Sequence, residues 1–472
     1  MTLVRSATVR RPPRDSRVAV TVQIPERTSD PEWLSAARQG AAAWVNAHGL
    51  PSTTHEDWRY TDIDAALAIP LVVPPEQVEE DHPIVVSRND LPVPNLGGVR
   101  IVVVNGRLVP ELSDLEHALV AGVHVESLVD SRHGRLEQWW TKRDGGYRHA
   151  LRALNDAAAL DAVLIDLSAA VIVEEPIEVV LVSTPVTVAR WSHPRLIVVA
   201  GAGARATIVE TYVNVSDSPT ATNALTQIDL DVGAQITHYV LQDEHMDSFH
   251  FSALEGRLGS DSQLSSRLLA TGARIGRHEV AIVLAGEGSK VNLDGLFLTG
   301  SGQHHDNPLL VKHAAANCTS RQLYKGVVTG DGHGVFNGHI VVCPGADGTD
   351  AAQVNKNLLL SEYAEVDTRP RLEINACDVA CTHGAAVGQL DPDSLFYLRS
   401  RGVSEREARM ILVSGFAGEI LDRFEPGSLR RRAEQMMIAA GVAVFDDRGV
   451  DPETSRSVAV DSHDRSDGRR QA

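Results

Sequence analysis

The chain has 472 residues, of which 43% are hydrophobic and 22% are charged, as in ordinary folded proteins. Its 44 Lys and Arg against 62 Asp and Glu give a net charge of −18, which argues against nucleic acid or an anionic lipid surface as a partner. No run of about 18 apolar residues exists to span a bilayer, and the basic first residues lack the apolar core of a signal peptide. We therefore expect a cytoplasmic protein whose four cysteines are thiols.

The two ends of the chain, residues 1–28 and 446–472, are polar with little to bury, and we expect both to be disordered. Residues 29–160 predict a mixed α and β region. It opens with a helix, because Pro31 suits the first helical position and apolar residues recur at helical spacing after it. This helix should end near Gly49.

From 161 to 385 the pattern changes to short β-rich runs separated by turn residues, without amphipathic helices between them. Successive turn-then-strand units are offset by 30, 28 and 27 residues, and a further unit follows a 75-residue gap. A loose period of this length predicts a parallel β-helix, in which each coil buries its inner face by stacking on the next. A large β-sandwich is the alternative. The units carry small residues at Ala204, Ala234, Ser262, Ser289 and Ala364.

Residues 386–445 predict a helical region. Asp391 and Pro392 begin a helix that Gly402 ends, and Ser404 with Glu407 forms a capping box for the next helix. A third helix is expected from about residue 428. This region either closes the end of the β-helix or offers a docking surface.

A cluster of metal-binding residue types, Cys377-x-x-x-Cys381-x-His383, lies at the junction of the β and helical regions. Thiolate and imidazole suit iron and zinc, and on a strand Cys381 and His383 point to the same face. Two further ligands are not close in sequence. Three interpretations stay open: a labile or shared metal site, a reactive thiol, and a buried cysteine beside a hydrogen-bonded histidine.

A second group of ligand types consists of His304, His305, Asp306 and His313, in a glycine-containing stretch that predicts an exposed loop. A metal role is the less favoured interpretation there, because we expect histidines in such a loop to be solvated. No GxxxxGK[ST] motif is present, so we do not expect this chain to hydrolyse ATP.

Several stretches resemble the SufB/SufD family of iron-sulfur cluster assembly proteins. The most specific is DVACTHGAAVGQLDPDSLFYLRSRGVSEREAR, at 378–409. Its HGAAVGQLD run resembles the signature of SufD, whereas SufB-like chains carry Glu at the position of Gly384. The other stretches that carry the resemblance are 56–64, 154–182, 320–342, 356–374 and 416–421.

This resemblance implies a mainly β fold, a right-handed parallel β-helix flanked by an N-terminal α+β region and C-terminal helices. It also implies a non-enzymatic subunit of a SufB–SufC–SufD scaffold that supports iron acquisition and cluster assembly. A SufB-like paralogue would pair through the β-helix, where Cys381 and His383 would handle iron or a cluster. The SufC ATPase would dock on the C-terminal helices, at Pro392, Leu395, Arg399, Arg406, Arg409 and Phe416.

The resemblance further implies that the isolated chain, which could be a homodimer, holds no cofactor stably. Iron or a cluster would be bound transiently in the complex, and a flavin could associate with the complex. A SufB-like scaffold that itself holds the nascent cluster is the alternative within the family. A polysaccharide-active β-helix enzyme is the alternative from another class, and the lack of a signal peptide, aromatic platforms and a carboxylate pair disfavours it.

Overall fold

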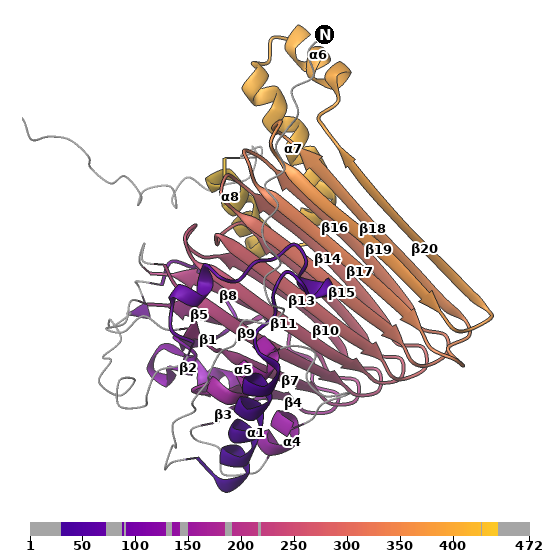
Figure 1. Cartoon of the computed structure of the whole chain (residues 1–472). Helices are drawn as coiled ribbons and strands as arrows, with labels where there is room; N and C mark the ends of the chain where they lie inside the picture. The colour runs from indigo at the N-terminus through magenta and orange to yellow at the C-terminus, as the bar shows by residue number, and fades with distance from the viewer. Residues whose placement is uncertain are drawn as a thin grey trace, which may run out of the picture.

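The computed structural model describes residues 30–71, 87–88, 91–128, 135–141, 150–184, 191–215, 219–425 and 427–441. The two segments predicted to be disordered lie outside these ranges. The described chain is mainly β, with a long stack of strands between N-terminal and C-terminal helices (Figure 1). The predicted fold class, a β-solenoid with flanking helices, is therefore confirmed.

Two sheets form the solenoid. The first has the spatial order β2 (Arg107–Leu108), β1 (Val99–Val104), β5 (Ile177–Ser183), β8 (Arg205–Asn214), β10 (Gln235–Asp243), β12 (Gln263–Ala270), β14 (Lys290–Thr299), β16 (Thr319–Val328), β18 (Thr349–Leu359) and β20 (Val379–Gly388). The second has the order β19 (Glu365–Ile374), β17 (His333–Val342), β15 (His304–His313), β13 (Ile275–Leu284), β11 (Phe249–Leu258), β9 (Ala221–Leu230), β7 (Arg195–Ala200), β4 (Val163–Leu167) and β3 (Val123–Ser127), with β6 (Trp191–Ser192) beside β9.

The chain alternates between the sheets, and from β4 onward each strand pairs in parallel with the strand one coil later. Gln263 pairs with Lys290, 27 residues further on, and Thr319 pairs with Asp350, 31 residues further on. The coil length therefore agrees with the period in the sequence. The N-terminal region also contributes to the sheets, because β1 pairs in parallel with β5 and β3 pairs antiparallel with β4.

Small residues stand at the corners, as predicted, but in two rows. Ala204, Ala234, Ser262 and Ser289 are each 0% exposed and directly precede strands of the first sheet. Ala364 directly precedes β19 and so stands at a corner of the second sheet.

Helices cover both outer faces of the solenoid. α1 (Glu32–His48) and α5 (Ala150–Ala158) pack on the second sheet, and α7 (Glu405–Leu421) with α8 (Gly427–Ala439) packs on the first. The remaining helices are α3 (Leu115–Val120), α4 (Arg135–Thr141) and α6 (Pro392–Ser400), with short 3-10 turns at Glu56–Trp58, Ala66–Ala68 and Pro110–Leu112.

The predicted helix ends are confirmed. α1 stops before Gly49, whose φ of 67° is a conformation that glycine adopts without strain. Asp391 caps α6 with its carboxylate, and Ser404 with Glu407 forms the capping box of α7. Among the described residues, no helix combines the length and the apolar character needed to cross a membrane.

Candidate functional site

The last coil leaves two strand edges open. β20 is paired with β18 and β19 with β17, and neither has a second neighbour among the strands that the structure describes. An open edge presents backbone N–H and C=O groups that a strand of another chain can pair with.

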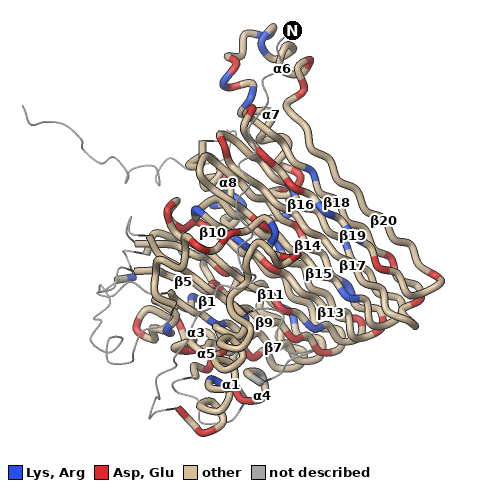
Figure 2. Tube along the Cα trace, in the orientation of Figure 1, with Lys and Arg blue, Asp and Glu red and all other residues tan. Residues whose placement is uncertain are grey.

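The two open edges differ in their protection against such pairing. β19 (EVDTRPRLEI) alternates charged residues and contains Pro370, and both features discourage edge pairing. β20 (VACTHGAAVG) contains no Lys, Arg, Asp or Glu, and its trace is tan along its whole length in Figure 2. β20 is therefore the edge better suited to accept another chain.

Cys381 and His383 lie on the same face of β20, as strand alternation predicts. In register, Cys381 is paired with Ala351 and His383 with Gln353. Cys381 is half-buried against the apolar cluster that includes Ile340, so this face is the inner face of the solenoid. His383 is exposed because no further coil covers it.

Two glutamines form the layers beneath His383. Gln353 is 1% exposed, and its Nε2 donates a hydrogen bond to Oε1 of Gln322 at 3.1 Å. Its Oε1 has no hydrogen-bond partner, so a buried acceptor is left available next to His383. Gly338 makes room for this side chain, because a Cβ at that position would collide with Nε2 of Gln353. Gln353 was not predicted from the sequence. It could have been found from the repeat, because it stands one coil before His383.

The pair combines a thiol and an imidazole, which are both side chains of the kinds that bind iron and zinc. Burial raises the pKa of the Cys381 thiol, so a nearby cation is needed to form the thiolate. All four cysteines are free thiols. In the described parts of the chain, no three His, Cys, Asp or Glu side chains are arranged to hold a metal ion. Cys381 and His383 thus offer two ligands, and an additional chain at the β20 edge could supply others.

The second predicted group of ligand types lies on a strand, so the expected exposed loop is wrong. His305 and His313 are 0% exposed on the inner face of β15, whereas His304 and Asp306 lie on its outer face. Burial lowers the pKa of His305 to about 4 and that of His313 to about 4. The polar residues of this stretch suggested a loop, but they lie on a solenoid strand and point alternately to its inner and outer faces.

The tip made by α6 and the start of α7 projects beyond the sheets (Figure 1). Phe396 and Tyr397 on α6 are 74% and 58% exposed, and the Arg401 guanidinium lies 5.3 Å from the Tyr397 ring centroid. Exposed aromatic side chains on a capped helix are typical of a protein-binding surface. The sequence analysis placed the contact on this helix but did not single out these two residues.

The predicted docking residues fall into two groups. Pro392, Arg399, Arg406 and Arg409 are exposed on the tip, and Leu395 is half-buried there. Arg399 and Arg409 both lie within ion-pair distance of Glu405, at 3.6 Å and 3.3 Å.

Phe416 lies apart from this group, where α7 meets the first sheet. It is half-buried and packs with the cluster between α7, α8 and that sheet.

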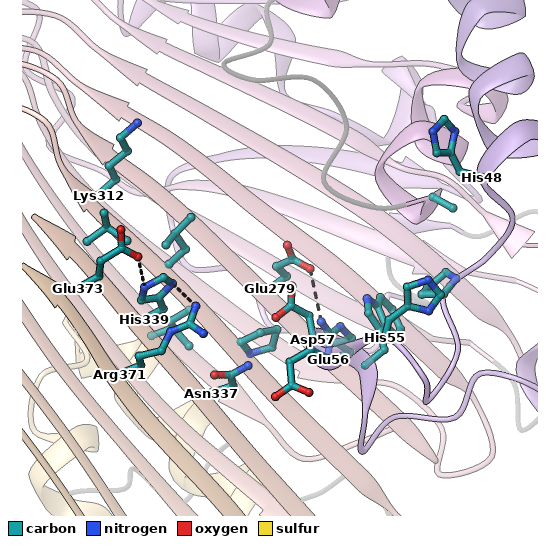
Figure 3. Close-up of a pocket in the computed structure, with 18 of the residues that line it drawn as sticks. His48, His55, Glu56, Asp57, Glu279, Lys312, Asn337, His339, Arg371 and Glu373 are labelled. Atoms are coloured by element: carbon teal, nitrogen blue, oxygen red, sulfur yellow. Dashed lines mark hydrogen bonds and ion pairs between the residues drawn. The ribbon is translucent and has the colours of Figure 1, made fainter. Parts of the chain in front are cut away.

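A cavity of about 750 Å³ lies between the N-terminal segment and the outer face of the second sheet (Figure 3). In it, Nη2 of Arg371 donates to Nδ1 of His339 at 2.8 Å, and Nε2 of His339 is 3.4 Å from the Glu373 carboxylate. Acidic side chains, such as Glu56 and Asp57, and basic ones, such as Lys312, both line the cavity. This mixture of charges selects neither an anion nor a cation.

The fold is a parallel β-solenoid whose last coil has an uncharged open strand that carries Cys381 and His383. Residues 184–416 match the SufBD core domain of SUF-system iron-sulfur cluster assembly proteins, and residues 24–179 match the SufBD N-terminal region. The chain belongs to the SufBD family of iron-sulfur cluster assembly proteins.

Similar proteins from several organisms support this assignment. An iron-sulfur cluster assembly SufBD family protein of Synechocystis is 32% identical over 413 residues, which cover 84% of this chain and 89% of that protein. The iron-sulfur cluster assembly protein SufD of Escherichia coli is 31% identical over 386 residues, which cover 81% of this chain and 88% of that protein. A chloroplastic Arabidopsis protein, ABCI7, is 32% identical over 246 residues, which cover 51% of each chain.

Proposed function

We propose that this chain is the SufD-like, non-enzymatic subunit of a SufB–SufC–SufD assembly complex. The observation that supports this most directly is the uncharged open edge of β20, which carries Cys381 and His383 at the end of the solenoid. A second solenoid that pairs with β20 would extend the first sheet and cover His383. The ligand set would then be completed by side chains of the SufB-like partner.

The projecting tip is the proposed docking site of a SufC-like ATPase. Its two helices are fixed by side-chain caps, so the surface they present is preformed, and its centre is aromatic. The ATPase cycle would act on α7, whose lower half is packed on the first sheet. Movement of the tip would thereby be transmitted to the solenoid, where iron and sulfide assemble.

A SufD-like role is favoured over a SufB-like scaffold by Gly384. No atom lies within 4 Å of the position that its Cβ would occupy, so the glycine is not required by packing. A carboxylate would fit there, yet the chain lacks it. Anaerobic addition of iron and sulfide to the isolated chain separates the two roles, because a SufB-like scaffold would retain a cluster alone.

Co-purification with SufB-like and SufC-like partners tests the proposal as a whole. Replacing Thr382 and Ala386 on β20 by Lys should abolish retention of the SufB-like chain, because charged edges resist strand addition. Val232→Lys, in an exposed turn far from this edge, is the matched control and should leave retention unchanged. Undiminished retention by the doubly substituted chain, with normal thermal stability, would show that β20 is not the pairing edge.

A further inference from the structure

Two histidines face each other on the outer side of the second sheet, on the two strands next to its open edge strand β19. His304 on β15 is paired in register with His333 on β17, and their Nδ1 atoms are 3.2 Å apart. The N-terminal segment covers them, with the Tyr60 ring standing edge-on to His333 at 6.2 Å. Of the residues predicted as one group with His304, His305 and His313 point to the other face of the strand.

The neighbours of the outer ring nitrogens fix the tautomers. The Thr61 hydroxyl donates to Oδ2 of Asp306 at 2.5 Å, and Arg277 donates to the same oxygen. Because the Thr61 hydroxyl hydrogen is already donated to Asp306, the Thr61 oxygen accepts a hydrogen bond from Nε2 of His304, 2.9 Å away. On the other ring, Nε2 of His333 lies 2.9 Å from the Asp367 carboxylate and must donate to it.

With Nε2 of each ring donating to its outer neighbour, the two Nδ1 atoms face each other, and when unprotonated both are hydrogen-bond acceptors. Such a pair of acceptors repels unless a cation lies between them. A metal ion relieves the repulsion without protonating either ring.

We propose that His304 and His333 bind a borderline divalent transition-metal ion, of which Zn²⁺ is the reference, through their two Nδ1 atoms. Imidazole nitrogens about 2.0–2.1 Å from a tetrahedral ion stand about 3.4 Å apart, close to the observed separation of 3.2 Å. Hydrogen bonds from the distal N–H groups to Asp367 and Thr61 orient the rings, as outer-shell partners do in histidine–metal sites.

Glu365, the next residue in the same row of the sheet, could become a third ligand only after its side chain turns, because the three side chains do not form a metal site as they stand. Glu365 on β19 is paired in register with His333, and strand alternation places its side chain on the outer face beside the two histidines. Its carboxylate is exposed, so it can rotate toward an ion that the two rings hold. Water would occupy the fourth position. The ion would join β15, β17 and β19.

Titration of the full-length chain with Zn²⁺ and Co²⁺ at pH 7.5 tests this site without any partner protein. We expect one saturable site that is lost in His304→Gln and in His333→Gln but kept in His245→Gln, a control at a half-exposed histidine in a turn. Co²⁺ bound there should lack thiolate charge-transfer absorption, because both ring ligands are nitrogens. Zn²⁺ should raise the melting temperature of the wild-type chain more than that of either variant.

Substitutions of two carboxylates that are not buried, the half-buried Asp367 and the exposed Glu365, keep the test independent of folding. Asp367→Asn should weaken Zn²⁺ binding about 10- to 100-fold. Glu365→Gln should weaken it as well, whereas Glu362→Gln, in the turn before β19, should have no effect. Equal Zn²⁺ binding in the wild type and all these variants would overturn the proposal. A second result would also overturn the proposal: Zn²⁺ shows no saturable binding, and nitrogen NMR spectra show that the two rings share an imidazolium proton.

Discussion

The Nζ atom of Lys325 lies 2.6 Å from Oε2 of Glu419, and this ion pair joins β16 to α7. Lys325 also donates to the carbonyl oxygen of Phe416 at 2.7 Å, and its Nζ lies 4.5 Å from the Phe416 ring centroid. Burial lowers the pKa of Lys325, and the hydrogen bond from Lys325 lowers the pKa of Glu419. α7 (Glu405–Leu421) is therefore anchored toward its C-terminal end, and its start is left to project.

Lys325→Met should loosen α7 from the first sheet. The change leaves the Phe416 carbonyl without its donor and Glu419 with only the more distant Lys356, 3.6 Å away. We expect a loss of about 1–2 kcal/mol in the free energy of unfolding. Hydrogen exchange should quicken in α7 and not in β8 to β14. Lys290→Met, at an exposed position of β14, is the control, and equal exchange in both variants would contradict the anchoring role.

The buried histidines should make the fold sensitive to mild acid. The folded-state pKa values of His305 and His313 are each about 4, below the value of about 6.5 for an unfolded histidine. As pH falls from about 6.5 to 4, the unfolded chain takes up protons that the folded chain does not, so stability falls by about 1.4 kcal/mol per pH unit for each such histidine.

Replacing His305 by Gln should flatten this acid-side slope, because glutamine does not titrate and can still donate to the Gly272 carbonyl oxygen that His305 contacts at 2.8 Å. Denaturant unfolding at several pH values measures the slope. His48→Gln, at an exposed histidine on α1, should leave it unchanged. A slope that is the same in wild type and His305→Gln would show that this histidine does not titrate as its burial implies.

Much of the fold follows from local patterns in the sequence. The period of the small corner residues predicted the solenoid, and capping residues such as Ser404 predicted the C-terminal helices. What the sequence did not reveal depends on which face of a strand a polar residue takes. His304 and His305 are adjacent letters, yet one meets the N-terminal segment and the other lies inside the solenoid. Gln353 and His383 became neighbours only through the register of β18 and β20.

The exposed aromatic pair on α6 should be needed for docking of the ATPase. Replacing Phe396 and Tyr397 together by Ser removes apolar area that folding of this chain does not use, so the melting temperature should stay the same. Affinity for a SufC-like partner should fall at least about tenfold, as expected when central aromatic residues of an interface are truncated. Leu119→Ser, at an exposed position of α3, is the control. Unchanged affinity in the double variant would place the docking surface elsewhere.

Charge reversal at Arg406 should also weaken that contact. Arg406 is exposed, and no ion pair within the described chain is found for it, unlike Arg399 and Arg409, which share Glu405. Its reversal should therefore slow association with the partner without changing stability. Reversal of Arg257, an exposed residue on β11, is the control for net charge. The association rates of the wild type and the Arg406 variant should differ at low salt and become similar at high salt, because salt screens the charge of Arg406.

His383→Ala should impair cluster formation in the assembled complex while leaving the fold and the subunit contacts intact. His383 is exposed at the open end and is not packed by a further coil, so its removal leaves no cavity. One imidazole is also a small part of an edge-to-edge interface that runs along β20. Cluster yield, melting temperature and retention of the SufB-like partner should be measured on the same preparations.

The opposing interpretation is that His383 stabilises the last coil through Gln353. In that case the melting temperature would fall by several degrees, and the loss of cluster would follow the loss of folded protein. Gln353→Leu separates the two, because it removes the buried amide beneath His383 and keeps the imidazole. Normal stability with lost assembly in His383→Ala, beside near-normal assembly in Gln353→Leu, would identify the imidazole itself as the group that handles the metal.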